Sequence, residues 1–182
     1  MNSKISLIIP VFNECDEIEN FFNDLKKCNF DLINEIIFVN DSSTDNSLNL
    51  LKKKINEFEN SLFKIKFLII NNLKNRGYGF SIKKGVNNST NENIAIIDLD
   101  RTYKIEDLNN ISNEFINTYK LQYDLIAGER KIDTTNTSRL KIIGKTLINM
   151  ITNFCFNEKI IDYNSGLRVF NKNKFIKHCH MM

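Results

Sequence analysis

The chain has 182 residues, of which 42% are hydrophobic and 26% charged, which is enough to build the core of one globular domain. Its formal net charge is only +3, and Lys and Arg are interleaved with Asp and Glu along the chain, so the composition does not indicate a nucleic-acid-binding protein. No apolar run approaches the roughly 18 residues that a membrane span needs, so we expect a cytoplasmic protein, or one bound peripherally at the cytoplasmic face of a membrane.

The cysteines and the N-terminus agree with this location. Cys15, Cys28, Cys155 and Cys179 lie far apart and form no CxxC pair, which is typical of reduced thiols. The opening segment reaches Pro10 and a charged stretch too early to be the apolar core of a signal peptide.

Short apolar runs alternate with longer helical patterns along the chain. This alternation predicts βα units, and therefore a Rossmann-like α/β fold with a mostly parallel sheet flanked by helices. Strands are predicted at residues 5–10, 35–40, 63–70, 93–100 and 123–128, and helices at 16–28, 44–58, 77–86 and 138–156, with a helical pattern also after residue 103. No repeat or Pro/Gly-rich linker interrupts the pattern, so residues 1–182 are predicted to form a single domain.

Polar clusters follow four of the predicted strands. They are PVFNE after the first strand, NDSSTD after the second, NNLKNRGYG after the third and DLDRT after the fourth. Ligands of open α/β sheets bind outside the carboxyl ends of the strands, so the four clusters are expected to converge on one crevice.

The DLD segment combines two carboxylates one residue apart at the end of an apolar run. Asp98 and Asp100 repel each other there, so the arrangement favours a bound cation or a nearby donor. The alternative is that these residues belong to the start of the helix that follows.

Six blocks, in their order and intervals, resemble family 2 glycosyltransferases with the GT-A fold, in the branch of dolichol-phosphate mannose synthase and the bacterial polyprenyl-phosphate sugar transferases. The blocks are SLIIPVFNE, EIIFVNDSSTDNS, NRGYGFSIKKG, IAIIDLD, DLIAGER and DYNSGLRVF, and they extend from about Ile5 to Phe170. The resemblance implies a metal-dependent, inverting transfer of a sugar from a nucleotide-sugar donor to a polyprenyl phosphate, or to a glycan hydroxyl in cell-surface polysaccharide synthesis.

The same resemblance assigns a donor site. It implies that Asp100 is a ligand of Mg²⁺ or Mn²⁺ and that Asp98 holds the ribose or the metal shell. Pro10, Phe12 and Glu14 are expected to shape the base and ribose pocket, and Asp41 to accept a hydrogen bond from the nucleobase. The NRGYG element, which includes Asn75 and Gly77, is expected to approach the donor closely, with an ordinary loop as the alternative. The alternatives for the first three are a strand end, a core aromatic and an acid at a helix start.

The remaining assignments concern the leaving group and the acceptor. By resemblance, Arg130 faces the diphosphate, Asp162 lies near the reacting centre, and Arg168 reaches a phosphate beyond a turn at Ser165 and Gly166. Asp162 is the candidate base if the acceptor is a hydroxyl, whereas a lipid phosphate is already anionic and needs no base. The alternatives are a solvated Arg130, a turn-capping Asp162, and an Arg168 paired with a surface acid.

One predicted helix bears on membrane binding. The predicted helix 138–156 is basic near its start and apolar beyond, so it is expected either to rest in a bilayer interface or to pack on the sheet.

The family domain normally continues past GLRVF, so the domain is predicted to be C-terminally short, and a catalytically silent subunit remains an alternative. A nucleotidyltransferase is a further alternative, although it would need a Gly-rich basic loop where this chain has PVFNECDE. The HCH sequence at residues 178–180 is expected to be a frayed tail rather than a metal site.

Overall fold

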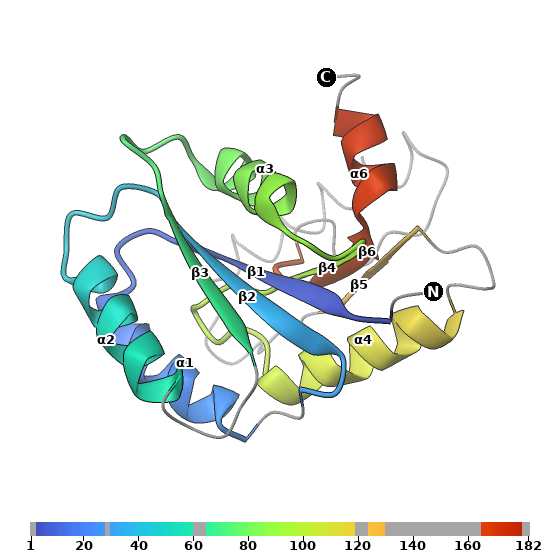
Figure 1. Cartoon of the computed structure of the whole chain (residues 1–182), viewed down its shortest axis with the longest axis horizontal. Coiled ribbons are helices and arrows are strands. Elements are labelled where there is room, and N and C mark those ends of the chain that lie inside the picture. Colours follow the sequence, from blue (N-terminus) through green and yellow to red (C-terminus); the bar gives the residue numbers. More distant parts are fainter. Residues whose placement is uncertain (1–2, 28–29, 60–64, 119–123, 130–164, 180–182) are drawn as a thin grey trace, which may run out of the picture.

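A six-stranded sheet with helices on both faces forms the framework of the chain (Figure 1). The computed structural model describes residues 3–27, 30–59, 65–118, 124–129 and 165–179. The strands within these ranges are β1 (Ile5–Val11), β2 (Ile33–Asn40), β3 (Lys66–Asn71), β4 (Asn93–Ile96), β5 (Leu125–Ala127) and β6 (Arg168–Asn171).

The strand order is β3-β2-β1-β4-β6-β5, and the first four strands in the chain are parallel. β6 runs antiparallel to both of its neighbours, β4 and β5. The predicted α/β fold with a mostly parallel sheet is therefore confirmed. The sequence did not predict β6 as a strand, because its four residues follow a turn-forming motif and are too few to establish a period.

Five helices cover the two faces of the sheet within the described ranges. They are α1 (Cys15–Leu25), α2 (Ser47–Glu59), α3 (Tyr78–Asn88), α4 (Ile105–Thr118) and α6 (Lys172–Cys179). Figure 1 shows α1, α2 and α4 on one face, and α3 and α6 on the other. The pattern along β1 explains the two layers, because Leu7 and Ile9 join the core under α1, α2 and α4 while Ile8 joins the core under α3 and α6.

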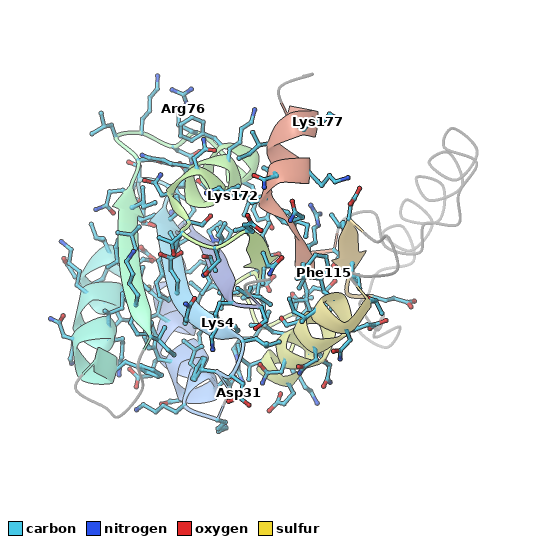
Figure 2. The ribbon with its side chains drawn as sticks, turned by 45° about the vertical axis from the view of Figure 1, so that its right-hand side comes forward. Lys4, Asp31, Arg76, Phe115, Lys172 and Lys177 are labelled. Carbon is cyan, nitrogen blue, oxygen red and sulfur yellow. The ribbon has the colours of Figure 1, made fainter. Side chains whose placement is uncertain are left out.

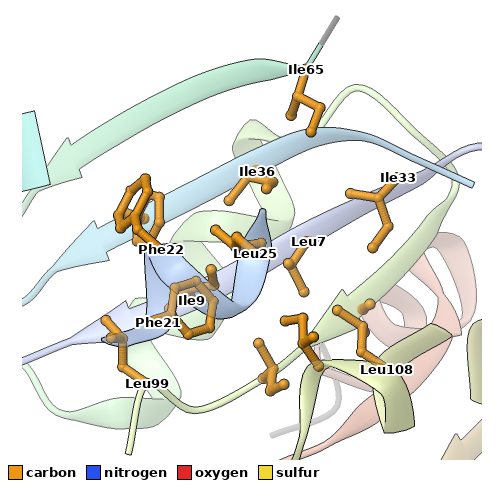
Figure 3. Packing of buried hydrophobic residues seen from close by; sticks show 14 of the residues in the cluster. Leu7, Ile9, Phe21, Phe22, Leu25, Ile33, Ile36, Ile65, Leu99 and Leu108 are labelled. Atoms are coloured by element: carbon orange, nitrogen blue, oxygen red, sulfur yellow. The ribbon is translucent and has the colours of Figure 1, made fainter. Parts of the chain in front are cut away.

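The larger core lies between α1 and the sheet. Phe21, Phe22 and Leu25 are on the buried side of α1, and Figure 3 shows them beside Leu7 and Ile9 of β1. The spacing of three and four residues places these α1 side chains on one stripe of the helix. Burial of such side chains contributes roughly 1.5–3 kcal/mol each, so this interface is a principal source of the stability that fixes the strand ends.

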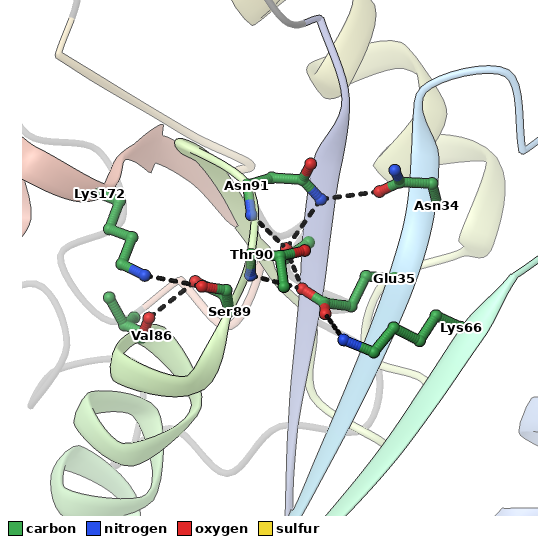
Figure 4. A network of polar contacts seen from close by, with 9 residues as sticks. Asn34, Glu35, Lys66, Val86, Ser89, Thr90, Asn91 and Lys172 are labelled. Carbon is green, nitrogen blue, oxygen red and sulfur yellow. Dashed lines mark hydrogen bonds and ion pairs between the residues drawn. The ribbon is translucent and has the colours of Figure 1, made fainter.

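The sheet is tied together by polar contacts at the start of its parallel strands (Figure 4). Glu35 of β2 is 1% exposed; it accepts hydrogen bonds from Ser6 Oγ (2.5 Å) and the Thr90 N–H (2.9 Å), and Lys66 Nζ lies 3.1 Å away. Burial opposes ionisation of Glu35, but these donors outweigh it and lower its pKa. The network lies at the opposite end of the strands from the predicted ligand crevice, so its role is structural.

One predicted strand ends earlier than expected, and one helix was not predicted. The predicted strand 93–100 ends at Ile96, and although the Ile97 N–H still bonds to the Ile8 carbonyl oxygen, the chain then leaves the sheet before Asp98. The helix α6 was not predicted, because Phe175 and Ile176 are too few apolar residues to indicate a helical face. The predicted helix 138–156 lies outside the described residues.

Candidate active site

A pocket of about 370 Å³ opens at the carboxyl ends of the parallel strands. Eight of the residues predicted for the donor and metal site line it: Pro10, Phe12, Glu14, Asp41, Asn75, Gly77, Asp98 and Asp100. Val11, Tyr78, Ser81 and Leu99 complete the lining and were not predicted. The sequence-based expectation that four separate strand ends meet in one crevice therefore holds.

Phe12 and Glu14 occupy the loop between β1 and α1. Phe12 is 44% exposed, so the alternative of a core aromatic does not apply. Glu14 directly precedes α1, but its side chain makes no capping hydrogen bond. Both side chains are therefore available to a ligand in the pocket.

The β1–α1 loop is interlocked with the loop after β2. The Asn13 side-chain oxygen accepts the Thr44 N–H (2.8 Å), and in return Ser43 Oγ accepts the Asn13 N–H (3.0 Å). At the next residue of the β1–α1 loop, the Glu14 N–H donates a hydrogen bond to Ser47 Oγ (2.9 Å). Asn13 adopts a positive φ of 56°, which asparagine tolerates better than most other residues. These reciprocal bonds fix the backbone that presents Phe12 and Glu14.

Asp41 forms the buried floor of the pocket after β2. Its carboxylate accepts hydrogen bonds from Asn72 Nδ2 (2.6 Å), the Arg76 N–H (2.9 Å) and the Gly77 N–H (2.7 Å). Burial opposes ionisation, but these donors outweigh it and lower the pKa of Asp41. Asp41 thus holds the glycine-containing loop in place. Its predicted hydrogen bond to a nucleobase stays a prediction.

The loop held by Asp41 leads directly into α3. Gly77 has a φ of 85°, which favours glycine, and it is the residue that precedes the first turn of the helix. The next residue, Tyr78, donates a hydrogen bond from its hydroxyl group to Asp98 Oδ1 (2.9 Å). Burial and the negative charge of Asp98 raise the pKa of Tyr78, so its hydroxyl group remains a donor. This contact depends on the orientation of α3, which the sequence pattern does not define, and Tyr78 was missed for that reason.

Acidic side chains gather on the β4 side of the pocket. Burial raises the pKa of Glu14, and the negative charges of Asp100, Asp98 and further acids nearby raise it more. Asp100 is exposed, and its carboxylate accepts the Thr102 N–H (2.9 Å). Neither aspartate caps α4, which begins at Ile105. The alternative reading of DLD as a helix start is therefore wrong.

Arg101 stands between Asp100 and Thr102 but does not belong to this acidic group. Its φ is 58°, and its Nε lies 3.1 Å from the Asp24 carboxylate on α1. The left-handed backbone at Arg101 turns its side chain to α1, away from the side chain of Asp100. The basic residue therefore leaves the negative charge of the DLD segment available to a ligand.

The chemistry of these acids fits a hard divalent cation. Asp98, Asp100 and Glu14 offer only oxygen donors, and a bound cation would relieve the repulsion that raises the pKa of Glu14. Among the described residues, no group of three or more His, Cys, Asp or Glu side chains is arranged to hold a metal ion. Phosphate oxygens of a ligand and water would therefore have to complete the coordination of a cation here.

The SGLRVF segment lies against the same acids. Ser165 is buried, and its hydroxyl group shares a hydrogen bond with the Tyr103 hydroxyl group (2.9 Å). A Cβ atom at Gly166 would overlap the carboxylate of Asp98, so this close approach requires glycine. Arg168 of β6 is near enough that its charge partly offsets the rise in the pKa of Tyr78. The structure thus brings residues some 70 positions apart in the sequence to one side of the pocket.

Several predicted residues lie outside the part of the chain that the structure describes. Arg130 and Asp162 lie outside the described residues, as does His180 of the HCH sequence. Cys15 is a free thiol, as expected, while Cys28 and Cys155 lie in undescribed segments. The roles proposed for Arg130 and Asp162 stay predictions.

The family follows from a comparison of the whole sequence with known proteins. A model of the family described as "Glycosyl transferase family 2" matches residues 6–179. The chain belongs to this family. The match includes all of the strands and helices given above except the first residue of β1, so the resemblance carried by the six sequence blocks is confirmed.

Two characterised relatives resemble the chain along almost its whole length. The undecaprenyl-phosphate 4-deoxy-4-formamido-L-arabinose transferase of Yersinia enterocolitica is 26% identical over 183 residues, covering 97% of this chain and 52% of the relative. The UDP-N-acetylglucosamine–dolichyl-phosphate N-acetylglucosaminyltransferase of Methanococcus voltae is 29% identical over 180 residues, covering 92% and 69%. The chain thus spans about half of the first relative and about two thirds of the second.

Solved structures show that the family 2 domain has the GT-A fold. A mannosyltransferase from Pyrobaculum calidifontis, in complex with GDP-Man and Mn²⁺, superimposes with a TM-score of 0.66 at 14% identity, covering 97% of this chain and 46% of that one. Glucosyl-3-phosphoglycerate synthase from Mycobacterium tuberculosis, in complex with Mn²⁺, UDP-glucose and glycerol 3-phosphate, gives a TM-score of 0.64 at 14% identity, covering 93% of this chain and 57% of that one.

In the part of the chain that the structure describes, no helix is both long enough and apolar enough to cross a membrane.

Proposed function

We propose that the chain binds a nucleotide-diphosphate sugar in the pocket at the strand ends and transfers the sugar, with inversion, to a polyprenyl phosphate. The observation that carries the proposal is the convergence of eight predicted donor-site residues on one pocket with an acidic side. The names of the two relatives, which act on undecaprenyl and dolichyl phosphate, support the class of acceptor.

In this proposal the pocket divides into two sides. Phe12 and Asp41 form the side for the base and ribose, with the Asn75–Gly77 loop held close by the Asp41 carboxylate. Asp98 and Asp100 form the side for the diphosphate and would hold a Mg²⁺ or Mn²⁺ ion together with its oxygens. Such an ion, when bound, neutralises the charge that develops on the departing diphosphate. Both solved structures named above contain Mn²⁺, which supports this cofactor.

The residues around Asp98 then act by positioning. Tyr78 donates to one carboxylate oxygen of Asp98, while Gly166 lies against the other side of the group. The carboxylate is held in one orientation before a ligand binds, which reduces the cost of ordering it in the reaction. Arg130 and Arg168 are proposed to contact phosphate groups, and Asp162 to lie near the reacting centre.

The acceptor decides how much chemistry the chain must supply. A phosphate monoester carries negative charge at neutral pH and attacks the anomeric carbon without a base, whereas a sugar hydroxyl needs a carboxylate to take its proton. The relatives favour the lipid phosphate over a glycan hydroxyl. The reaction is accordingly proposed to occur at a membrane surface, with the cytoplasmic face as the predicted side.

The direct test is a transfer assay on the full chain. The chain is incubated with labelled UDP- and GDP-sugars, a short-chain polyprenyl phosphate in detergent and Mn²⁺ or Mg²⁺, and label in the organic phase is counted. We expect label there for one donor, and its loss in Asp100→Ala but not in Glu106→Ala, a change of an exposed acid outside the pocket. Transfer only to sugar hydroxyls would replace the acceptor, and donor binding without any transfer would support a catalytically silent subunit.

A further inference from the structure

The helices α1 and α4 on one face of the sheet carry only negative charge, whereas the helical segments on the other face carry only positive charge; α2, which lies with α1 and α4, contains three Lys and two Glu residues. The segments Cys15–Leu25 and Ile105–Thr118, which form α1 and α4, contain seven Asp and Glu residues and no Lys or Arg. On the other face, residues 72–88 and α6 (Lys172–Cys179) contain seven Lys and Arg residues and no Asp or Glu. The three helices of the first face therefore hold nine Asp and Glu residues against three Lys residues, whereas residues 72–88 and α6 are purely basic.

The basic face begins at the rim of the pocket, in the loop between β3 and α3. Lys74 and Arg76 are exposed on this loop, and Lys83 is exposed on α3. Lys84 is turned instead to the end of β3, where it donates to the Asn71 carbonyl oxygen (3.2 Å) and to Asn72 Oδ1 (2.8 Å). The charge of Lys84 is therefore not matched by a carboxylate in this contact.

The helix α6 continues the basic face. Lys172 donates to the Ser89 carbonyl oxygen (2.7 Å), Lys174 lies 3.5 Å from the exposed carboxylate of Asp124, and Lys177 is exposed. Figure 2 shows Lys177 on α6 and Arg76 beside α3 along the same upper side of the molecule. The cations of α6 and of the segment 72–88 therefore lie on the same side of the molecule.

Apolar side chains stand among these cations at the pocket rim. Leu73 is fully exposed (103%), although aliphatic side chains of this size are usually at least partly covered. Phe80 is 37% exposed, and the Arg76 guanidinium lies 4.5 Å from the centroid of its ring. An exposed leucine and phenylalanine beside Lys and Arg is the combination found on surfaces that bind the interface of anionic membranes.

We propose that the face formed by residues 72–88 and α6 binds the surface of an anionic lipid bilayer, with Leu73 and Phe80 entering the headgroup region. The positive charge of the face matches anionic headgroups, and the acidic face formed by α1 and α4 would point away from them. A nucleic acid would also match the charge, but it would leave the exposed Leu73 without an apolar partner. Binding in this orientation would place the pocket rim beside the bilayer.

The proposal is tested by co-sedimentation of the full chain with vesicles. Vesicles of phosphatidylcholine and phosphatidylglycerol in equal parts are compared with vesicles of phosphatidylcholine alone. We expect binding only to the anionic vesicles, weakened by salt. No nucleotide, sugar or polyprenyl phosphate is present, so failure here leaves the proposed sugar transfer standing, and failure of sugar transfer leaves this result unaffected.

Variants locate the surface. Lys74→Glu with Lys83→Glu should weaken vesicle binding by at least about twenty-five-fold, since each cation near an anionic surface contributes about a factor of five. The matched control is Lys52→Glu with Lys53→Glu on α2, which changes the net charge equally on the opposite face and should leave most of the binding intact. Leu73→Asn should weaken binding about tenfold without changing its salt dependence.

Three outcomes would overturn the proposal. They are absence of binding to the anionic vesicles, an equal loss in the two charge-reversed variants, and binding to a single-stranded oligonucleotide that is tighter than binding to the vesicles. The last result would assign the basic face to nucleic acid.

Discussion

Replacing Asp41 tests whether this carboxylate holds the Asn75–Gly77 loop. Asp41→Ala removes an acceptor from three donors, namely Asn72 Nδ2 and the N–H groups of Arg76 and Gly77. A hydrogen bond to a charged group contributes roughly 1.5–3 kcal/mol, but the two loop N–H groups can turn to water in the variant. Counting the buried Asn72 contact in full and the others in part, we expect a loss of about 3–4 kcal/mol in the free energy of unfolding.

The measurement is urea unfolding at neutral pH, followed by circular dichroism, for the parent chain, Asp41→Ala and Asp41→Asn. The asparagine variant keeps one carbonyl oxygen as an acceptor, so we expect about half the loss. Glu106→Ala is the control, because it removes an exposed carboxylate and should change the free energy by less than about 0.5 kcal/mol. A cost of less than about 1 kcal/mol for Asp41→Ala would show that the three hydrogen bonds contribute little and that Asp41 does not hold the loop.

Three further substitutions probe the loops around the pocket. The pKa of Asp45 is lowered to about 2, because its hydrogen bonds with Ser47 and Cys15 outweigh the effect of burial. The ionised Asp45 therefore stabilises the fold above its ordinary pKa of 3.8, and this contribution is lost as the pH falls from about 4 to 2. After allowance for solvent screening we expect about 1 kcal/mol, so the stabilities of the parent and Asp45→Asn should converge in that range of urea titrations; a constant difference would contradict this. Tyr78 is 44% exposed, so water can replace its hydrogen bond to Asp98 in Tyr78→Phe, and we expect unfolding to change by less than about 1 kcal/mol while Mn²⁺-dependent nucleotide binding weakens about tenfold in calorimetry. Unchanged affinity would mean that the hydroxyl group does not orient Asp98. Gly166→Ala should weaken the same binding more strongly, because a Cβ atom there displaces the Asp98 carboxylate, and parent-like affinity would show that the close approach is unimportant.

Much of the fold follows from the sequence because the parallel strands are buried on both faces. β1 and β2 each contain an apolar run, Leu7–Val11 and Ile36–Val39, that is followed by a polar loop, and such runs are recognisable without any tertiary information. The strand ends then locate the site, since they must lie at one edge of a parallel sheet. This is why Asp41, Asp98 and Asp100 were found as members of one pocket.

The contacts that were missed depend on orientation rather than on local pattern. Tyr78 reaches Asp98 only because of the angle at which α3 leaves the loop, and Gly166 meets Asp98 only because β6 inserts beside β4. The charge separation was missed for the same reason. Arg76 and Lys177 are distant in sequence, and only the layer to which each belongs shows that they share a face.

The most direct test of the donor site is calorimetric titration of the full chain with UDP, GDP and their sugars, with and without Mn²⁺. We expect Mn²⁺-dependent binding of one nucleotide to the parent chain and to Glu106→Ala, and none to Asp100→Ala. Binding to Asp100→Ala with unchanged Mn²⁺ dependence, or no binding of any nucleotide to the parent chain, would contradict the assignment of this pocket as a nucleotide-sugar site.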